Sequence, residues 1–377
     1  MQKAVVEAEH RNERVGAGAG RLERRVVMDP QIAAEPEDRG VSTVVQQHVS
    51  YHLNRMLIPT AIDTALDRSI VLGYGRIGLF ARRRLPVWPA DPPRIDGAAV
   101  IVTGAASGLG LAAACGFARL GATVHALARN TERAAEAVAQ IAEAVPGADV
   151  RPHACDLSSL AAVKSFAEDF LAREPRLDAL VNNAGVMPPE RTRSADGHEL
   201  MFATHVLAPL ALTTLLFPEG PGRVVNVSSG GMYTQSLPRD RDWESDHTPY
   251  SPKKLYARTK REEVVITEML AERLRGRGVV VHAMHPGWAE TEGLKRAMPS
   301  FRKAIRPIIR SANEGADTIV WLGAAPEPAR TTGLFWHDRR ARPTHYRFGP
   351  GAESQGDRKR LWDYCEVGLA PAGIEPL

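Results

Sequence analysis

A tyrosine and a lysine stand four residues apart in the segment LYARTK, at positions Tyr256 and Lys260. On a helix, this spacing places both side chains on the same face. A cation beside a phenol favours the ionised phenolate, so such a pair is suited to taking up and releasing a proton. Pairs with this spacing are also common on solvated helix faces. The rest of the chain must therefore distinguish proton transfer from an ordinary surface pair.

A glycine-rich segment, TGAASGLG, follows an apolar run and precedes a helix-forming one. In a strand–turn–helix unit, Gly104 allows a tight turn, Gly108 lets the backbone approach a pyrophosphate, and Gly110 lets the helix pack on the strand. The amino end of the helix offers N–H donors and positive potential to the phosphates. This context predicts a dinucleotide site, and the alternative is a glycine-rich turn that binds no ligand.

The end of the next apolar run indicates which dinucleotide is bound. An Asp or Glu at this point would bind the adenosine ribose diol of NAD. Here the run ends in Leu127, Ala128 and Arg129. Alanine leaves room, and the planar guanidinium can pair with a 2′-phosphate. The sequence therefore favours NADP(H) without excluding NAD(H), and the alternative is a solvated arginine at the start of a helix.

Short β-rich runs alternate with helix-forming segments from about residue 96 onward. The β-rich runs are AAVIVTG, ATVHALA, ADVRPHA, LDALVNN, RVVNVSS and VVVHAMH. Apolar strands that alternate with helices predict a parallel sheet with helices on both faces. We therefore expect an α/β fold with a single doubly wound, Rossmann-like sheet over residues 96–340, followed by a C-terminal tail at 341–377.

The residues before this domain differ in composition. Residues 1–55 mix charges without apolar periodicity, which predicts a disordered extension, and Met56 is a candidate translation start. Residues 56–95 combine apolar side chains with three arginines at 82–84 and end in a proline-rich linker. They predict either a basic amphipathic segment that touches anionic lipid through residues 76–94, or an arm folded over the main domain.

Charge and cysteine content exclude several classes of protein. A formal charge of +4 over 377 residues gives no basis for nucleic-acid binding. The three cysteines, Cys115, Cys155 and Cys365, form no CxxC pair. This usage fits a reducing cytoplasm and argues against a disulfide framework or a zinc site. We expect no metal at His282 and His285 either, because residues three apart on a strand face opposite sides.

Five motifs occur in a fixed order and resemble the short-chain dehydrogenase/reductase family. They are TGAASGLG, NNAG (182–185), NVSS (226–229), Tyr256-x-x-x-Lys260 and HPGWAET (285–291). Within the family, VSSGGM, MHPGWAET, AMPSF and GADTIVWL look like the branch called dehydrogenase/reductase SDR family member 12. The resemblance implies an NADP-dependent oxidoreductase that acts on a small-molecule carbonyl or alcohol. The alternatives are a dinucleotide sensor without turnover and a membrane-docked scaffold.

The resemblance also assigns catalytic roles. Reduction of a carbonyl needs a hydride, which the nicotinamide supplies, and a proton, which the enzyme must supply. Tyr256 would be this acid, and Lys260 would lower its pKa from ~10 and bind the nicotinamide ribose. Ser229 would hold the substrate oxygen and stabilise developing negative charge, with Ser228 as the alternative.

Further positions match those that contact the cofactor in the family. Residues after the third strand match the contacts to the adenine, residues in NNAG match those to the ribose, and residues past the sixth strand match those to the nicotinamide carboxamide. The residues predicted to bind the cofactor are Thr103, Gly104, Ser107, Gly108, Leu109, Gly110, Arg129, Asp156, Leu157, Asn182, Ala184, Tyr256, Lys260, Pro286, Gly287 and Thr291. The alternatives are helix capping for Asp156 and turn geometry for the glycine and proline positions.

The chain departs from the family in the helix after NNAG. Many members carry an asparagine there, which anchors a water linked to the active-site lysine, whereas this chain has His205. Imidazole titrates near ~6.5 and can both donate and accept, so His205 is predicted to act either as a proton relay or as a core histidine. The helices that carry His205 and Tyr256 are also candidates for packing subunits into a homo-oligomer, as in many relatives.

Two segments are expected to frame the substrate. The insert at residues 230–254 is long and charged, and we expect it to form part of the substrate mouth. Residues 292–311 are amphipathic and occupy the position of the family's substrate-covering loop. Their apolar side chains would form either a ceiling for an apolar substrate or part of the core. These side chains are Met298, Phe301, Ile305 and Ile308.

Overall fold

The computed structural model describes residues 60–217, 220–346 and 349–377. The expected extension at residues 1–55 and the candidate start at Met56 lie outside the described residues. All statements below concern the described part.

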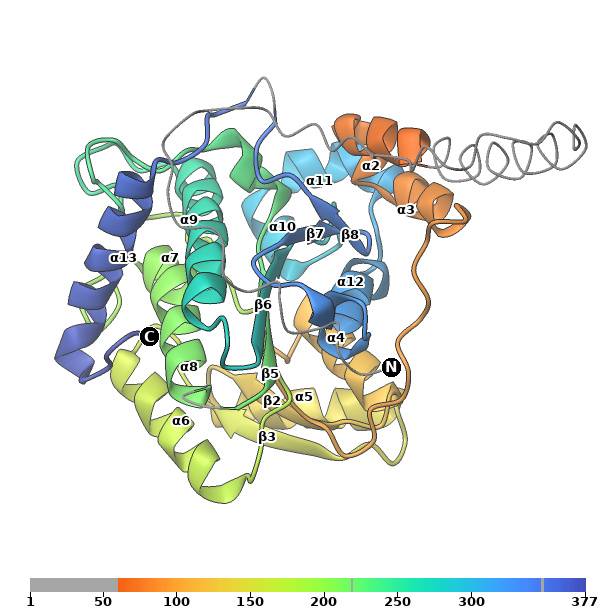
Figure 1. Cartoon of the computed structure of the whole chain (residues 1–377), viewed down its shortest axis with the longest axis horizontal. Coiled ribbons are helices and arrows are strands. Elements are labelled where there is room, and N and C mark those ends of the chain that lie inside the picture. The colour runs from red at the N-terminus through yellow and green to blue at the C-terminus, as the bar shows by residue number, and fades with distance from the viewer. Residues whose placement is uncertain (1–59, 218–219, 347–348) are drawn as a thin grey trace, which may run out of the picture. The chain divides into compact units, whose positions relative to one another are not determined.

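A single eight-stranded sheet organises the chain (Figure 1), with the order β3-β2-β1-β4-β5-β6-β7-β8. Six strands are those expected from the sequence: β1 (Ala99–Thr103), β2 (Thr123–Ala128), β3 (Val150–Ala154), β4 (Ala179–Asn182), β5 (Gly222–Val227) and β6 (Val279–Met284). Two short strands extend the edge: β7 (Phe335–His337) is parallel to β6, and β8 (Arg340–Arg342) is antiparallel to β7. The predicted doubly wound parallel sheet is confirmed, with one antiparallel strand added.

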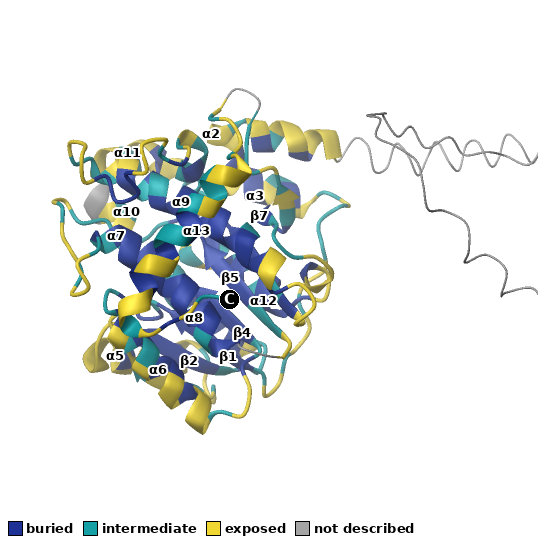
Figure 2. Ribbon diagram, turned by 60° about the vertical axis from the view of Figure 1, so that its left-hand side comes forward, coloured by how far each residue is buried: buried dark blue, intermediate teal, exposed yellow. Residues whose placement is uncertain are grey.

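Helices cover both faces of this sheet. One face carries α6 (Leu160–Arg173), α8 (Ala208–Leu216) and α9 (Pro252–Arg273), and the other carries α4 (Gly108–Arg119), α5 (Thr131–Ala144) and α12 (Ala312–Ala324). Alternate strand residues serve the two cores: Ile101 and Leu180 pack under α6, α8 and α9, whereas Val100 and Val181 pack under α4, α5 and α12. Strands β1, β2, β4 and β5 are accordingly buried on both sides (Figure 2), whereas the edge strand β3 is largely exposed.

Short elements connect these layers. Between β4 and α8 lie α7 (Leu200–Phe202) and a π-helical turn, η1 (Ala203–Leu207). After β5 comes the 3₁₀ turn η2 (Gly230–Thr234). Between β6 and α12 lie α10 (Glu292–Ala297), α11 (Pro299–Ile305) and η3 (Arg306–Ile308), and η4 (Pro328–Arg330) precedes β7.

The segment that was expected to be an arm or a lipid-contacting helix is folded onto the main domain. It contains α2 (Ile70–Gly73) and α3 (Arg76–Arg83). Arg82 is only 2% exposed and pairs with Asp338, which follows β7, at 2.6 Å. The structure therefore shows the second of the two alternatives for this segment, although part of its surface still faces solvent.

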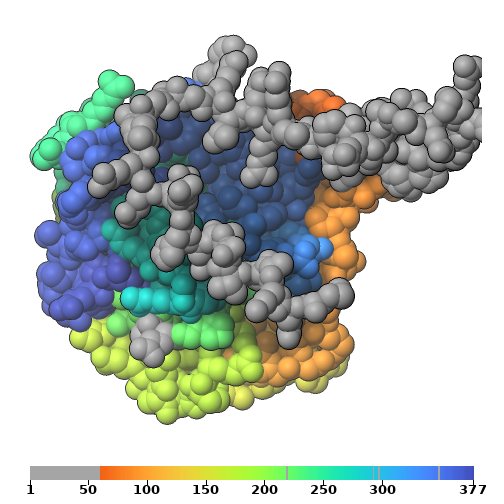
Figure 3. Space-filling model, viewed as in Figure 1, coloured from red at the N-terminus to blue at the C-terminus, as the bar shows by residue number. Residues whose placement is uncertain are grey.

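The C-terminal tail at residues 341–377 contains a helix, α13 (Gln355–Leu369), which begins with a capping box between Ser354 and Asp357. Its Trp362 and Cys365 are buried in the core that α9 also enters. Helix α13 lies against α9 in Figure 1, and the blue C-terminal residues adjoin the yellow-green surface of α6 in Figure 3. The last turn, η5 (Ala370–Ala372), is held by Lys164 Nζ, which donates to the Ala372 carbonyl at 3.2 Å.

Candidate active site

Most of the predicted site residues line one cavity, with a volume of about 730 Å³. It lies beyond the carboxyl ends of the strands, where open α/β sheets bind their ligands. The predicted residues in its wall are Gly104, Ser107, Gly108, Leu109, Arg129, Asp156, Leu157, Ala184, Ser229, Tyr256, Lys260, Pro286, Gly287 and Thr291. Four other predicted residues do not line the cavity, so any contribution they make is through the residues of its wall. They are Thr103, Gly110, Asn182 and His205.

The glycine-rich segment forms a tight turn between β1 and α4. Gly104 has φ of +66° and Gly108 has φ of +58°, a region that side chains other than glycine rarely adopt. A Cβ at Gly110 would lie 2.3 Å from the Gly104 carbonyl oxygen, so the helix packs directly on the turn. Ser107 precedes α4 without making a side-chain capping bond, which leaves first-turn N–H groups for an anionic ligand. These features fit a dinucleotide pyrophosphate.

Two predicted residues support the cavity from behind. The Thr103 hydroxyl accepts hydrogen bonds from the N–H groups of Asn183 and Ala184, both at 2.9 Å, and so ties β1 to the NNAG loop. Asn182 is 3% exposed and its amide donates to Asn226 on β5 at 2.8 Å. The neighbouring Asn183 lies in the cavity wall instead. Because successive residues of a strand point to opposite sides, the doublet itself contained this signal.

The adenosine end of the cavity carries Arg129 and Asp156. Arg129 is exposed at the end of β2, and within the described ranges its guanidinium has no ion pair, so it is available to an anionic group. One oxygen of Asp156 accepts from the N–H and the hydroxyl of Ser158, at 2.9 and 2.8 Å. This turn holds the carboxylate at the wall, whereas Ser159 caps helix α6 by accepting from Ala162 N–H, so Asp156 is not the helix cap and its contact with the cofactor stays a prediction.

Helix α9 brings Tyr256 and Lys260 into the same cavity as Ser229, which precedes η2. The Ser229 oxygen accepts from Gly231 N–H at 3.2 Å, which leaves its own hydrogen for a ligand. Ser228, the alternative, is buried and donates to the Lys260 carbonyl at 2.7 Å. Its hydroxyl is therefore already used, and the geometry favours Ser229 as the hydroxyl that meets a substrate.

A carboxylate that the sequence reasoning missed contacts the lysine. Lys260 Nζ donates to the Val227 carbonyl at 2.9 Å and to Glu263 Oε2 at 3.0 Å. Burial raises the pKa of Glu263 to about 7, although Lys260 opposes this shift. The contact orients the ammonium group at the cavity wall. Its signal in the sequence was the three-residue spacing of Glu263 from Lys260 on one helix.

His205 lies in the π-helical turn, fully buried, behind the tyrosine. Its Nε2 accepts from Val186 N–H at 3.0 Å, and its Nδ1 faces the Thr259 hydroxyl at 2.8 Å. Burial and then the charge of Lys260 lower its pKa well below the ordinary value, so the ring is neutral. The ring stands edge-on to Tyr256, with centroids 5.4 Å apart. This is the geometry of a core histidine that braces the tyrosine; the proton-relay role stays a prediction.

The remaining wall is largely apolar. Met298 and Phe301, from the expected ceiling, line the cavity, whereas Ile305 is buried and Ile308 packs against Gly75. The insert contributes its first turn and Lys253 to the wall, and its central residues are fixed by the buried Trp243 and Glu244. Several further wall residues were not predicted from the sequence. Three large ones among them are Ile70, Tyr74 and Trp288.

Comparison with known proteins identifies the family. The family described as short chain dehydrogenase matches residues 98–238. Dehydrogenase/reductase SDR family member 12 from Bos taurus is 38% identical over 278 residues, which cover 72% of this chain and 86% of the relative. The chain belongs to the short-chain dehydrogenase/reductase family. The resemblance to the family member 12 branch, noted from the sequence, is also confirmed.

Other short-chain dehydrogenase/reductases are similar over comparable lengths. Retinol dehydrogenase 14 from Mus musculus is 33% identical over 297 residues, covering 74% of this chain and 87% of the relative. The crystal structure of an uncharacterized protein from Mycobacterium paratuberculosis has 28% identity and a TM-score of 0.58, covering 76% of this chain and 98% of its own. A short chain dehydrogenase from Burkholderia cenocepacia, in complex with NADP, has 26% identity and a TM-score of 0.53, with coverages of 64% and 96%. Because the chain belongs to the short-chain dehydrogenase/reductase family, it is an oxidoreductase.

Two further observations concern the described residues alone. None of their helices is both long and apolar enough to cross a membrane. Among them, no group of three or more His, Cys, Asp or Glu side chains is arranged to hold a metal ion.

Proposed function

We propose that the protein is an NADP(H)-dependent oxidoreductase that interconverts an apolar carbonyl compound and its alcohol. The observation that supports this most strongly is the presence of Ser229, Tyr256 and Lys260 in the wall of the cavity that the glycine turn also lines. A sensor that only binds the dinucleotide would not need a hydroxyl, a phenol and an ammonium group gathered at the same place. The turnover function is therefore favoured over the binding-only alternative.

The proposed reaction assigns one task to each side chain. The dinucleotide, which the glycine turn and Arg129 would hold, would supply a hydride for the carbonyl carbon. Ser229 donates a hydrogen bond to the carbonyl oxygen and stabilises the negative charge that develops there. Tyr256 transfers its phenolic proton to that oxygen, which completes the alcohol, and Lys260 stabilises the phenolate that remains. Glu263 holds Lys260 in place through their 3.0 Å contact.

The reaction is tested by following NADPH oxidation at 340 nm with a panel of aldehydes, ketones and quinones. Oxidation that depends on an added carbonyl compound and yields its alcohol supports the proposal. A protein that binds NADPH but oxidises it with no member of the panel would favour the sensor instead. The variant that assigns the chemistry to Tyr256 is considered in the Discussion.

The preference for NADP(H) rests on Arg129 and Ala128. Both line the cavity at the end of β2, where a carboxylate would be needed to bind the ribose diol of NAD(H). A charge-assisted hydrogen bond contributes about 1.5–3 kcal/mol. We therefore expect Arg129→Ala to raise the dissociation constant for NADPH by roughly 10- to 100-fold.

The matched measurement for Arg129→Ala is binding of NADH, which lacks the 2′-phosphate and should be almost unaffected. Arg133→Ala is the control variant, because Arg133 is exposed on α5, pairs with Glu136 at 2.5 Å, and does not line the cavity. Equal losses of NADPH and NADH affinity in Arg129→Ala would contradict the assigned preference.

A second role, contact with a membrane surface, is supported by the outer face of α2, α3 and the residues just before them. Exposed apolar side chains gather on this segment, and single exposed residues are found elsewhere. The exposed large apolar side chains of the segment are Ile62, Ile70, Val71, Leu72, Ile77 and Phe80. Arg76, Arg83 and Arg84 are exposed on the same segment, a combination typical of peripheral binding to anionic lipid.

We expect the full-length protein to sediment with vesicles that contain phosphatidylserine, and the double variant Leu72→Glu/Phe80→Glu to sediment several-fold less. Both side chains are about half exposed, at 49% and 58%, so the fold should tolerate the change. Leu171→Glu is the control, because Leu171 is a comparably exposed leucine on α6. Equal sedimentation of all three proteins would reject the membrane role.

A further inference from the structure

The segment before the first strand contributes directly to the cavity. Tyr74 and Ile70 lie in the wall, although they precede β1 by more than twenty residues. Tyr74 is 3% exposed, whereas Ile70 is 50% exposed at the rim. The segment therefore has one residue inside the cavity and one at its opening. A linker that only connects elements would not line the cavity in this way.

Tyr74 is packed between the two loops that carry the proposed chemistry. A Cβ at Gly230, next to Ser229, would lie 2.5 Å from the Tyr74 ring, so the ring lies directly on that backbone. On the other side, the backbone N–H of Trp288 donates to the Tyr74 carbonyl at 2.8 Å, and the centroids of the two rings are 6.1 Å apart. Any substrate whose carbonyl oxygen meets Ser229 must therefore pass close to this ring.

The Tyr74 hydroxyl is committed to a hydrogen-bond chain. It lies 3.5 Å from the hydroxyl of Tyr346, which in turn donates to Asp67 at 3.2 Å. Burial raises the pKa of Tyr74 far above its ordinary value, so the phenol stays neutral. Tyr74 is thus unsuited to acid–base chemistry and acts as a rigid wall with a fixed ring orientation.

A buried ion cluster, which we call the arm clamp, fixes the segment to the edge of the sheet. It comprises Asp63 and Arg82 from the segment, and Arg310, Asp338 and Arg342 from the main domain. Arg82 contacts Asp63 at 2.9 Å and Asp338 at 2.6 Å. Arg310 reaches Asp338 at 2.6 Å, and Arg342 reaches Asp63 at 2.7 Å. All five side chains are at most 5% exposed.

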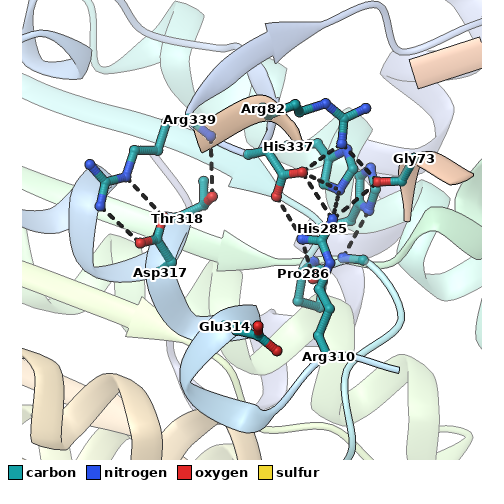
Figure 4. Close-up of polar contacts among 12 residues, drawn as sticks. Gly73, Arg82, His285, Pro286, Arg310, Glu314, Asp317, Thr318, His337 and Arg339 are labelled. Carbon is teal, nitrogen blue, oxygen red and sulfur yellow. Dashed lines mark hydrogen bonds and ion pairs between the residues drawn. The ribbon is translucent and has the colours of Figure 1, made fainter. Parts of the chain in front are cut away.

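The clamp also joins the segment to the loop after β6. Arg310 donates to the Gly73 carbonyl at 3.1 Å and to the Pro286 carbonyl at 3.2 Å (Figure 4). It also donates to the Gly75 carbonyl at 3.2 Å. Arg82 donates to the Gly73 carbonyl at 2.7 Å as well. Gly73 and Gly75 flank Tyr74, so the backbone on both sides of the tyrosine is held by the same guanidinium that holds the cavity loop.

We propose that residues 60–88 form a built-in cap on the active site, in which Tyr74 and Ile70 determine the size of substrate that fits. This inference rests on the proposed function for its choice of ligand class, an apolar carbonyl compound. The ligand would lie against the Tyr74 and Trp288 rings, which contact each other edge-on, with Met298 and Phe301 beyond them, and would leave past Ile70. Shortening Tyr74 opens the inner end of this space, and enlarging Ile70 narrows its opening.

The test measures binding, so that its result does not depend on turnover. Dissociation constants for a homologous series of straight-chain methyl ketones are measured by calorimetry in the presence of saturating NADP⁺, for the full-length protein and three variants. Tyr74→Ala should shift the preference toward longer ketones, changing the ratio of affinities for long and short members by about tenfold or more. Tyr74→Phe, which keeps the ring, should retain the wild-type ranking.

Ile70→Trp is the third variant, because Ile70 is half exposed and its replacement does not disturb the core. It should shift the preference toward shorter ketones, and this keeps the proposal testable if Tyr74→Ala does not fold. NADP⁺ affinity should be unchanged in every folded variant. An unchanged ketone ranking in Tyr74→Ala and Ile70→Trp, or no ketone binding by the wild-type protein, would overturn the cap. Binding that depends on Tyr74 without any NADPH oxidation would overturn only the proposed function.

Discussion

Tyr256→Phe is expected to reduce carbonyl-dependent NADPH oxidation by a factor of roughly 10² to 10⁴, while NADPH binding remains at the wild-type level. The substitution removes only the phenolic oxygen, so the ring still packs edge-on against His205. The proton that completes the alcohol then has no donor, and general acid catalysis contributes a factor of this size. The measurement is kcat with the best substrate of the panel, together with the dissociation constant of NADPH.

Tyr250→Phe provides the matched control for this prediction. Tyr250 lies six residues before Tyr256, does not line the cavity, and donates its hydroxyl to the Pro188 carbonyl at 2.8 Å. Its loss should leave kcat near the wild-type value. If Tyr256→Phe retained a wild-type rate, another group would have to supply the proton, and the assignment of the Tyr–Lys pair to proton transfer would be wrong.

Asp338→Asn is expected to lower the free energy of unfolding by about 3–5 kcal/mol, the cost of leaving buried charges without their partner. Asp338 is fully buried and accepts from Arg310 at 2.6 and 2.9 Å and from Arg82 at 2.6 Å. Its φ is +52°, a conformation that asparagine tolerates, so the substitution keeps the backbone and removes only the charge. Urea unfolding measures the difference, and Arg76→Gln is the control.

The control is informative because Arg76 lies on the same segment but forms an exposed pair with Glu314 at 3.4 Å. Such pairs contribute at most about 1 kcal/mol, so Arg76→Gln should be nearly neutral. A similarly small effect of Asp338→Asn would show that the arm clamp does not hold the segment.

The stability contributed by Asp338 also depends on pH. Burial alone would raise the pKa of this carboxyl, but Arg310 and Arg82 lower it below the ordinary value of 3.8. The ionised carboxyl therefore contributes its full stabilisation above pH 3.8, the ordinary pKa that it has in the unfolded chain. This contribution is lost as the pH falls through the lower pKa of Asp338 in the folded protein. The stability difference between the wild-type protein and Asp338→Asn should accordingly narrow in acid.

Much of the fold could be predicted because its signals are local. Most of the first six strands are apolar runs of nearly the right length, the exception being the edge strand β3 (VRPHA), and the glycine turn has its chemistry within eight residues. The edge of the sheet was missed, because β7 and β8 are three residues each and contain His337, Arg340 and Arg342. Strands this short carry no period-two pattern, and only the pairing of β7 with β6 and of β8 with β7 makes them part of the sheet.

The cap and the clamp could not be predicted for a different physical reason. Arg82 stands beside two other arginines, a pattern that is usually solvated or lipid-facing, and its partner Asp338 lies 256 residues away. Only the folded sheet brings these charges together in a buried place. Tyr74 was likewise one aromatic residue in an apolar run. Within the site, Glu263 and Asn183 could more easily have been predicted from the sequence. Asn183 directly follows the predicted Asn182, and Glu263 stands three residues after the predicted Lys260.

Helix α13 has a consequence for assembly. The long helices that carry Tyr256 and His205 were expected to be surfaces where subunits could meet, but α13 packs on α9 through Trp362, and Arg273 lies over that indole at 3.6 Å. A second subunit could reach this side of α9 only by displacing the protein's own last helix, together with the Arg358–Glu268 ion pair. The terminal helix thus covers this side of α9 within the chain, and we expect any homo-oligomer to be joined through another surface.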